Sequence, residues 1–197
     1  MYEPRGRGGP TARRAAAETL VGGIRFCAVL ASLAVTPGST GIAGAALAAV
    51  AVDIAVVDRR ALIIPDPLNA LAFVVGLAGA VLAAPEEPLE AILRALLRAA
   101  IMFSAFFAFR AGYRQLRGIE GIGLGDVKLA AVAGVWLDWV DLPIAVDIAA
   151  LAALAAALLR RLTWGDLDMR AKLPFGAFFA PAIWLCWLLA TWRHSDL

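Results

Sequence analysis

The segment from Gly118 to Leu129 places a carboxylate directly after a glycine-rich turn, at the start of an apolar segment. It reads GIEGIGLGDVKL, so Asp126 follows glycines at alternate positions. A charged side chain at bilayer depth is costly and usually marks a binding site, a proton relay or an ion pathway. A second aspartate, Asp58, ends another apolar segment. We therefore interpret Asp58 and Asp126 as a candidate pair.

A pair of neighbouring carboxylates is suited to acid–base chemistry. Two such groups cannot both ionise easily, so the pair is expected to share one proton. One carboxylate then acts as a base on water while the other donates to a carbonyl oxygen, which is aspartic peptidase chemistry. We expect Gly121, Gly123 and Gly125 to permit backbone conformations closed to other residues and to let a substrate backbone approach.

Each half of this pattern also has a simpler explanation. A glycine-rich turn before an aspartate is often only a loop and the N-cap of a helix. Asp58 lies beside Arg59 and Arg60, which by itself is more typical of a charge at the membrane interface. The chemical interpretation depends on the combination of the two aspartates.

The composition indicates that these residues are positioned by membrane helices. The chain is 62% hydrophobic and 17% charged, whereas soluble domains are roughly 45–50% apolar and about 25% charged. Cys27 and Cys186 lie in apolar runs and form no CxxC pair, so neither a disulfide framework nor a zinc site is expected. We predict an all-α, polytopic transmembrane bundle.

Seven apolar segments are predicted to be helices, because lipid leaves the backbone no other hydrogen-bond partners. They span residues 20–36, 40–57, 67–84, 91–111, 124–137, 143–159 and 174–192. The fifth is shorter than the roughly 17–25 residues that cross a bilayer, so it should begin at or inside the membrane rim. We expect a basic cytoplasmic arm at 1–19, a transmembrane domain at 20–192 and a tail at 193–197.

The distribution of arginine and lysine predicts the orientation, since cytoplasmic loops are enriched in both. The basic residues gather in the amino-terminal arm and in every second connection, with Arg94, Arg98 and Arg193 as exceptions. This predicts an amino terminus in the cytoplasm and a carboxyl terminus outside. Asp58 and Asp126 then both lie at cytoplasmic helix ends. An alternative for the first segment is a cleaved signal peptide, which would leave the remaining topology unchanged.

Three motifs together resemble those of bacterial prepilin peptidases, a family of GxGD aspartic proteases. Glu120 to Leu129, EGIGLGDVKL, is similar to the second active-site motif of that family. Asp58 to Asp66, DRRALIIPD, resembles the first motif, in which an aspartate stands seven residues before a proline, here Pro65. Leu173 to Gly176, LPFG, resembles a third signature. The resemblance covers roughly residues 40–190.

The resemblance implies an endopeptidase that removes the basic leader from prepilins or pseudopilins at the cytoplasmic face of the inner membrane. It implies that Asp58 and Asp126 are the catalytic pair and that the reaction needs no metal or cofactor. The substrate should enter as an amino-terminal helix from the bilayer. Pilus or secretion assembly proteins are candidate partners, and no nucleic-acid partner is expected. Larger members carry an amino-terminal domain with paired CxxC motifs for methyl transfer. This chain resembles the short, peptidase-only form.

Other charged residues leave alternatives open. Asp53 is a rival for the first aspartate, although it could instead pair with Arg25 in the first segment. Lys128 is either a cytoplasmic anchor or a group that tunes Asp126 or contacts substrate. Glu120 is a candidate for attracting the basic leader. A small proton-coupled transporter and an inactive pilus-assembly scaffold remain rival functions; the absence of two matching halves in the sequence disfavours the transporter.

Overall fold

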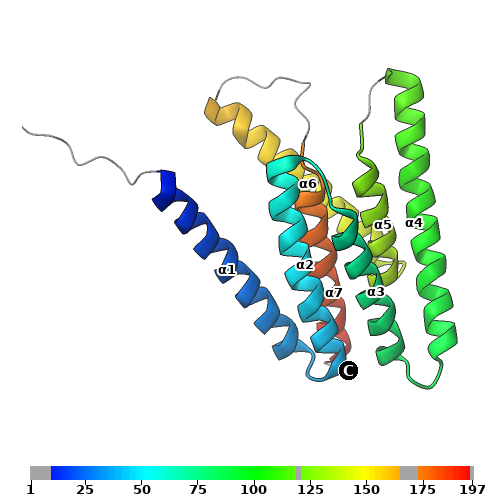
Figure 1. The fold of residues 1–197 in the computed structure, drawn as a ribbon. Coiled ribbons are helices and arrows are strands. Elements are labelled where there is room, and N and C mark those ends of the chain that lie inside the picture. The colour runs from blue at the N-terminus through cyan, green and yellow to red at the C-terminus, as the bar shows by residue number, and fades with distance from the viewer. Residues whose placement is uncertain (1–9, 119–120, 165–172, 196–197) are drawn as a thin grey trace, which may run out of the picture.

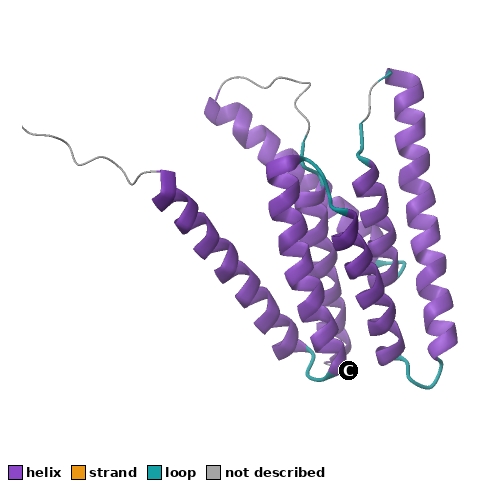
Figure 2. Cartoon of the chain, in the orientation of Figure 1, coloured by secondary structure: helices purple, strands orange, loops and turns teal. Residues whose placement is uncertain are grey.

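A computed structural model describes residues 10–118, 121–164 and 173–195 of the 197-residue chain, and within them every regular element is an α-helix (Figure 2). The helices in these residues are α1 (Pro10–Val35), α2 (Ser39–Ala61), α3 (Asp66–Ala83), α4 (Pro88–Arg117), α5 (Leu124–Trp136), α6 (Asp141–Trp164) and α7 (Gly176–Ser195). Five of them, α1, α2, α3, α4 and α6, are long and apolar enough to cross a membrane. The predicted fold class, an all-α bundle of about seven helices, is confirmed. The chain is a multi-pass membrane protein.

Several helices extend beyond the apolar segments that predicted them. The first begins at Pro10 rather than near residue 20, and α4 continues to Arg117 rather than ending near residue 111. Hydropathy marks only the part of a helix that faces lipid, whereas the helix itself continues to a local stop signal. For α4 that signal is Gly118, whose φ of 68° gives the left-handed conformation favoured after a helix.

The helices alternate in direction, so that the carboxyl ends of α2, α4 and α6 and the amino ends of α3, α5 and α7 lie at one end of the bundle (Figure 1). Helices α2 and α7 pack against each other in the middle, and α5 packs against α3, α4 and α7. Helix α1 leans away from the bundle at this same end (Figure 1). Asp58 and Asp126, which we call the dyad, lie at this end of the bundle, so we call it the dyad end.

Small residues bring the helices close together, as expected for packing in lipid. A Cβ added at Gly134 of α5 would lie 2.5 Å from the backbone nitrogen of Ala99 in α4. A Cβ at Gly44 of α2 would lie 1.8 Å from the Trp187 ring of α7. These contacts leave no room for even a methyl group. The glycines therefore set the spacing of α4 from α5 and of α2 from α7.

The arginines that break the charge pattern are paired with carboxylates. Arg98 is 13% exposed, donates from Nε to the Gly134 carbonyl at 3.1 Å and pairs with Asp138 at 2.9 Å. Arg94 pairs with Glu90 on the same helix. Pairing explains their position, because a carboxylate partner lowers the cost of a cation near lipid.

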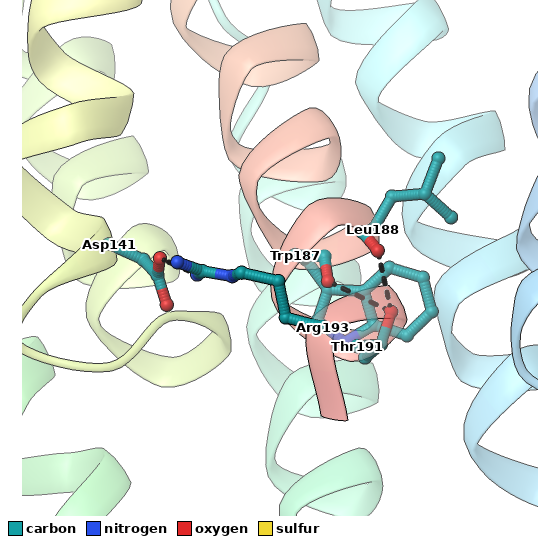
Figure 3. Close-up of polar contacts among 5 residues, drawn as sticks. All are labelled: Asp141, Trp187, Leu188, Thr191 and Arg193. Carbon is teal, nitrogen blue, oxygen red and sulfur yellow. Dashed lines mark hydrogen bonds and ion pairs between the residues drawn. The ribbon is translucent and has the colours of Figure 1, made fainter. Parts of the chain in front are cut away.

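Arg193, the third arginine that breaks the charge pattern, connects α7 to the start of α6 through an ion pair. It pairs with Asp141 at 2.6 Å, beside the turn in which Thr191 donates to the carbonyls of Trp187 and Leu188 (Figure 3). Asp141 is largely buried, so the pair compensates a charge that would otherwise be costly. The orientation of the bundle across the membrane stays a prediction from the charge distribution.

The close approach at Gly134 predicts the effect of a single methyl group. Gly134→Ala should lower the free energy of unfolding by about 1–3 kcal/mol, because the added Cβ forces the α4 and α5 backbones apart. Thermal unfolding of the purified protein in detergent measures this. Gly112→Ala is the matched control: Gly112 also lies in a helix, and a Cβ there meets no atom within 4 Å. Equal unfolding temperatures for the two variants would contradict the packing explanation.

Candidate active site

Asp58 lies in the last turn of α2 and faces the first turn of α7. Its side chain is buried, with 5% of the residue exposed. The Ala177 N–H donates to Asp58 Oδ2 at 2.8 Å. Helix α2 ends at Ala61, and its C-cap residue Leu62 adopts the left-handed conformation with φ 55° and donates its N–H to the Asp58 carbonyl. The backbone and the carboxylate of Asp58 are thus both engaged at the junction of α2 and α7.

Asp126 lies in the first turn of α5. The Gly123 N–H donates to Asp126 Oδ2 at 3.2 Å, so the carboxylate also caps the helix that carries it. The other oxygen, Oδ1, is buried and has no hydrogen-bond partner among the described residues. The simpler explanation of the motif, a helix cap, therefore holds for one oxygen. The second oxygen is available to hold a proton or to contact a water.

The start of α7 brings the two carboxylates into one site. The backbone N–H of Gly176 interacts with both Asp58 and Asp126, and the two carboxylates are close enough to interact electrostatically with each other. Backbone N–H groups at a helix start have no partner within the helix and carry partial positive charge, so they favour anions. The first amides of α7 thereby offset the repulsion between the two carboxylates.

Two glycines of the motif, Gly121 and Gly125, are required by space rather than by special backbone conformations. Among the glycines of the described residues, only Gly38 and Gly118 have positive φ, so the special backbone conformations expected of Gly121, Gly123 and Gly125 are not found, whereas the expected approach of a substrate backbone stays a prediction. A Cβ at Gly121 would lie 2.6 Å from the Tyr113 ring, and one at Gly125 would lie 2.9 Å from Ile64 Cβ. The glycine-rich turn is thus packed tightly against its neighbours.

Ile64 fills the space between the motifs. Besides meeting Gly125, its side chain would lie 2.4 Å from a Cβ at Gly176, where Asp58 Oδ2 would also be 3.1 Å away. Ile64 is buried and directly precedes Pro65, which is the N-cap of α3. The first, second and third motifs therefore meet around one side chain.

The remaining candidate residues are placed as follows. Lys128 pairs with Asp66 in α3 at 2.6 Å. The Pro65 carbonyl accepts hydrogen bonds from the N–H groups of Leu68 and Asn69, which starts α3 beside the dyad.

Glu120 lies outside the described residues. Asp53 pairs with Arg25 across α1 and α2, as one of the alternatives predicted, which favours Asp58 as the first aspartate.

Sequence reasoning missed three contributors to this site. Asn69 is buried and donates to the Gly125 carbonyl at 3.3 Å. Ile64 and the α7 amides at Gly176 and Ala177 are the others. A polar residue within the apolar segment 67–84 was a usable signal for Asn69, because such residues are costly in membranes. No side-chain type marks a backbone amide or a packing isoleucine in the sequence.

Chemically, this arrangement is suited to general acid–base catalysis on a carbonyl group. Two carboxylates, one with an oxygen that has no partner in the described part of the chain, lie at one end of a helical bundle beside the amides that start α7. A shared proton lets one carboxylate act as acid while the other acts as base.

Comparison with known proteins gives consistent matches. The chain is 34% identical over 164 residues to a prepilin leader peptidase/N-methyltransferase of Dickeya chrysanthemi, covering 82% of this chain and 54% of that protein. It is 42% identical over 88 residues to leader peptidase HopD of Escherichia coli, covering 45% of this chain and 57% of that protein. A Burkholderia pseudomallei prepilin leader peptidase/N-methyltransferase is 51% identical over 69 residues, covering 34% and 22%.

The chain thus spans between about a fifth and three fifths of the lengths of these relatives. No solved structure gave a significant match. The model of the type IV leader peptidase family matches residues 45–159, which is more than half of the chain and includes both Asp58 and Asp126. On this evidence, the protein belongs to the type IV leader peptidase family.

Proposed function

We propose that this protein is an intramembrane aspartic endopeptidase that removes the basic leader from prepilin-like or pseudopilin-like substrates. The observation that carries the proposal is the meeting of Asp58 and Asp126 at the start of α7, where one amide interacts with both carboxylates. Membership of the type IV leader peptidase family supports the substrate class. The relatives' names, prepilin leader peptidase, support it further.

In the proposed mechanism the dyad holds one proton before the substrate binds. The ionised carboxylate takes a proton from a water molecule as the water oxygen bonds to the scissile carbonyl carbon. The protonated carboxyl donates its proton to the carbonyl oxygen. Collapse of the tetrahedral intermediate breaks the C–N bond, and a proton from the dyad passes to the leaving nitrogen. The amides of α7 hold the carboxylates in position throughout.

The cleavage is proposed to occur at the cytoplasmic face of the inner membrane. The charge distribution supports this, because the dyad end carries Arg59 and Arg60 in the last turn of α2 and Arg114 and Arg117 in the last turn of α4. Such residues are enriched on the cytoplasmic side. The substrate would present a single apolar helix within the bilayer and its leader in the cytoplasm. Proteins of a pilus or a secretion system are the proposed assembly partners.

The leader is proposed to meet the loops at 59–66 and 113–125. A dyad that holds one proton carries close to one negative charge, and Glu120 adds another, so a basic leader is attracted. The arginines at the same end oppose this attraction and would keep the leader off the lipid surface. Recognition then depends on a balance of exposed charges, which salt screens.

Removal of either carboxylate should abolish the reaction. Asp58→Asn and Asp126→Asn should each lower cleavage at least about 100-fold, because asparagine can act neither as acid nor as base. The measurement is co-expression with a small membrane protein that has a Lys-rich leader before one apolar helix, followed by a gel assay for the shortened product. Both variants should accumulate in the membrane at the level of the unchanged protein.

Asp53→Asn is the matched control for this experiment. Asp53 is also a helical aspartate of α2, but it pairs with Arg25 on α1. This variant should retain most of the activity. An inactive Asp53→Asn beside an active Asp58→Asn would show that the first catalytic aspartate is assigned incorrectly.

Charge in the leader should control the rate of cleavage. Substrates with leader lysines replaced by glutamate should be cut more slowly at low ionic strength, and the difference should shrink as salt is raised. Attraction between exposed charges extends only about 8 Å at physiological ionic strength. Initial rates with purified enzyme and both substrates across a salt series measure this. Equal rates at low salt would mean that the leader charge is not recognised.

A further inference from the structure

We propose that the first turns of α3 position Asp126, through Asn69 on one side of that residue and Asp66 on the other. The inference rests on the proposed function, because positioning matters only if Asp126 reacts. Asn69 donates a hydrogen bond to the carbonyl of Gly125, the residue before Asp126. Asp66 forms an ion pair with Lys128, which lies two residues after Asp126. The two contacts bracket the reactive side chain along the chain.

Asn69 is the better buried of these two anchors, with 4% of the residue exposed. Its Nδ2 donates to the Gly125 carbonyl at 3.3 Å, and its Oδ1 has no partner among the described residues. A buried acceptor without a partner is costly, so an apolar side chain would serve packing alone better than this amide does. The bond to Gly125 is therefore the interaction that accounts for an amide here.

The ion pair between Asp66 and Lys128 contributes orientation more than stability. The Asp66 side chain is 71% exposed and that of Lys128 is 37% exposed, and ion pairs at such exposed positions add little to the free energy of folding. The pair nevertheless connects the first residue of α3 to the first turns of α5 at 2.6 Å. Together with the Asn69 bond, it restricts rotation of the first turns of α5 about the helix axis.

The same end of α3 is also connected to Asp58. Residues 62–65 lead directly from α2 to α3, and Ile64 in this connection packs against both Gly125 and the start of α7. A shift of the α3 amino end would therefore change the placement of Asp126 relative to Asp58. Displacements of about 1 Å at a reacting centre can cost about 100-fold in rate.

Asn69→Leu tests the buried anchor, because leucine has nearly the same shape but cannot donate a hydrogen bond. We expect kcat to fall about 10- to 100-fold with KM changed less than about twofold. Ser32→Ala is the matched control. Ser32 is buried in α1 and accepts a hydrogen bond from Trp184 Nε1 at 2.9 Å, away from the dyad end. Ser32→Ala should leave kcat unchanged, and a kcat of Asn69→Leu equal to that of the unchanged enzyme would overturn the proposal.

A charge exchange tests the second anchor and does not depend on whether Asn69→Leu folds. Asp66→Lys and Lys128→Asp should each lower kcat, and the double variant should recover most of the loss. Arg193→Gln is the control, since Arg193 belongs to an ion pair of the same 2.6 Å length (Figure 3). This pair joins the last turn of α7 to the start of α6, at the end of the bundle opposite the dyad end (Figure 1). Single variants with unchanged kcat, or a double variant no better than either single variant, would count against the role of Asp66.

A crosslinking measurement separates failure of this inference from failure of the proposed function. Cysteines at positions 58 and 126, with Cys27 and Cys186 replaced by alanine, are joined by a short bifunctional reagent. Adding Asn69→Leu should lower the crosslinking yield severalfold, whereas adding Ser32→Ala should not. If the unchanged protein cuts no leader but Asn69→Leu still lowers the yield, positioning holds and the proposed function is wrong. Equal yields with and without Asn69→Leu overturn the positioning itself.

Discussion

The start of α7 is the feature on which the arrangement at the dyad end depends. Two carboxylates from α2 and α5 converge there, and their mutual repulsion would separate the helices without compensation. The Ala177 amide donates to Asp58, and the Gly176 amide interacts with both carboxylates. These donors are the unpaired groups of a helix start, which favour negative charge, so backbone atoms of α7 contribute to stabilising the two carboxylates. The third motif thus has a physical role in holding the first two together.

The second constraint is the absence of side-chain atoms where the helices and turns meet. Gly125 and Gly176 both approach Ile64, and Gly134 approaches the backbone of Ala99. A side chain at these positions would require Ile64 or the α4 backbone to move. In lipid there is no hydrophobic driving force that brings apolar side chains together. Close backbone packing must therefore supply much of the attraction between helices. The geometry of the dyad and the stability of the bundle therefore have a common origin.

Three aspartates away from the dyad form ion pairs with arginines. Asp53 is paired with Arg25, Asp141 with Arg193, and Asp138 with Arg98. Each pair compensates a charge that would be expensive near lipid. Asp126 differs from all of these carboxylates, since one of its oxygens is buried and without a partner among the described residues. That contrast supports the proposed catalytic role of Asp126.

The sequence alone determined the number of helices, their order and the end at which Asp58 and Asp126 lie. These properties follow from hydropathy and from the alternation of direction along the chain, which are one-dimensional. It also indicated three motifs, but it did not show why they contain glycine, because the required spacing depends on neighbours such as Tyr113 and Ile64 from other elements. The tertiary structure decided which face of each helix meets which, and hence that Asn69, Ile64 and the α7 amides join the site. Rotation of a helix about its axis and its lateral neighbours are set by packing between segments far apart in the chain, which no local pattern records.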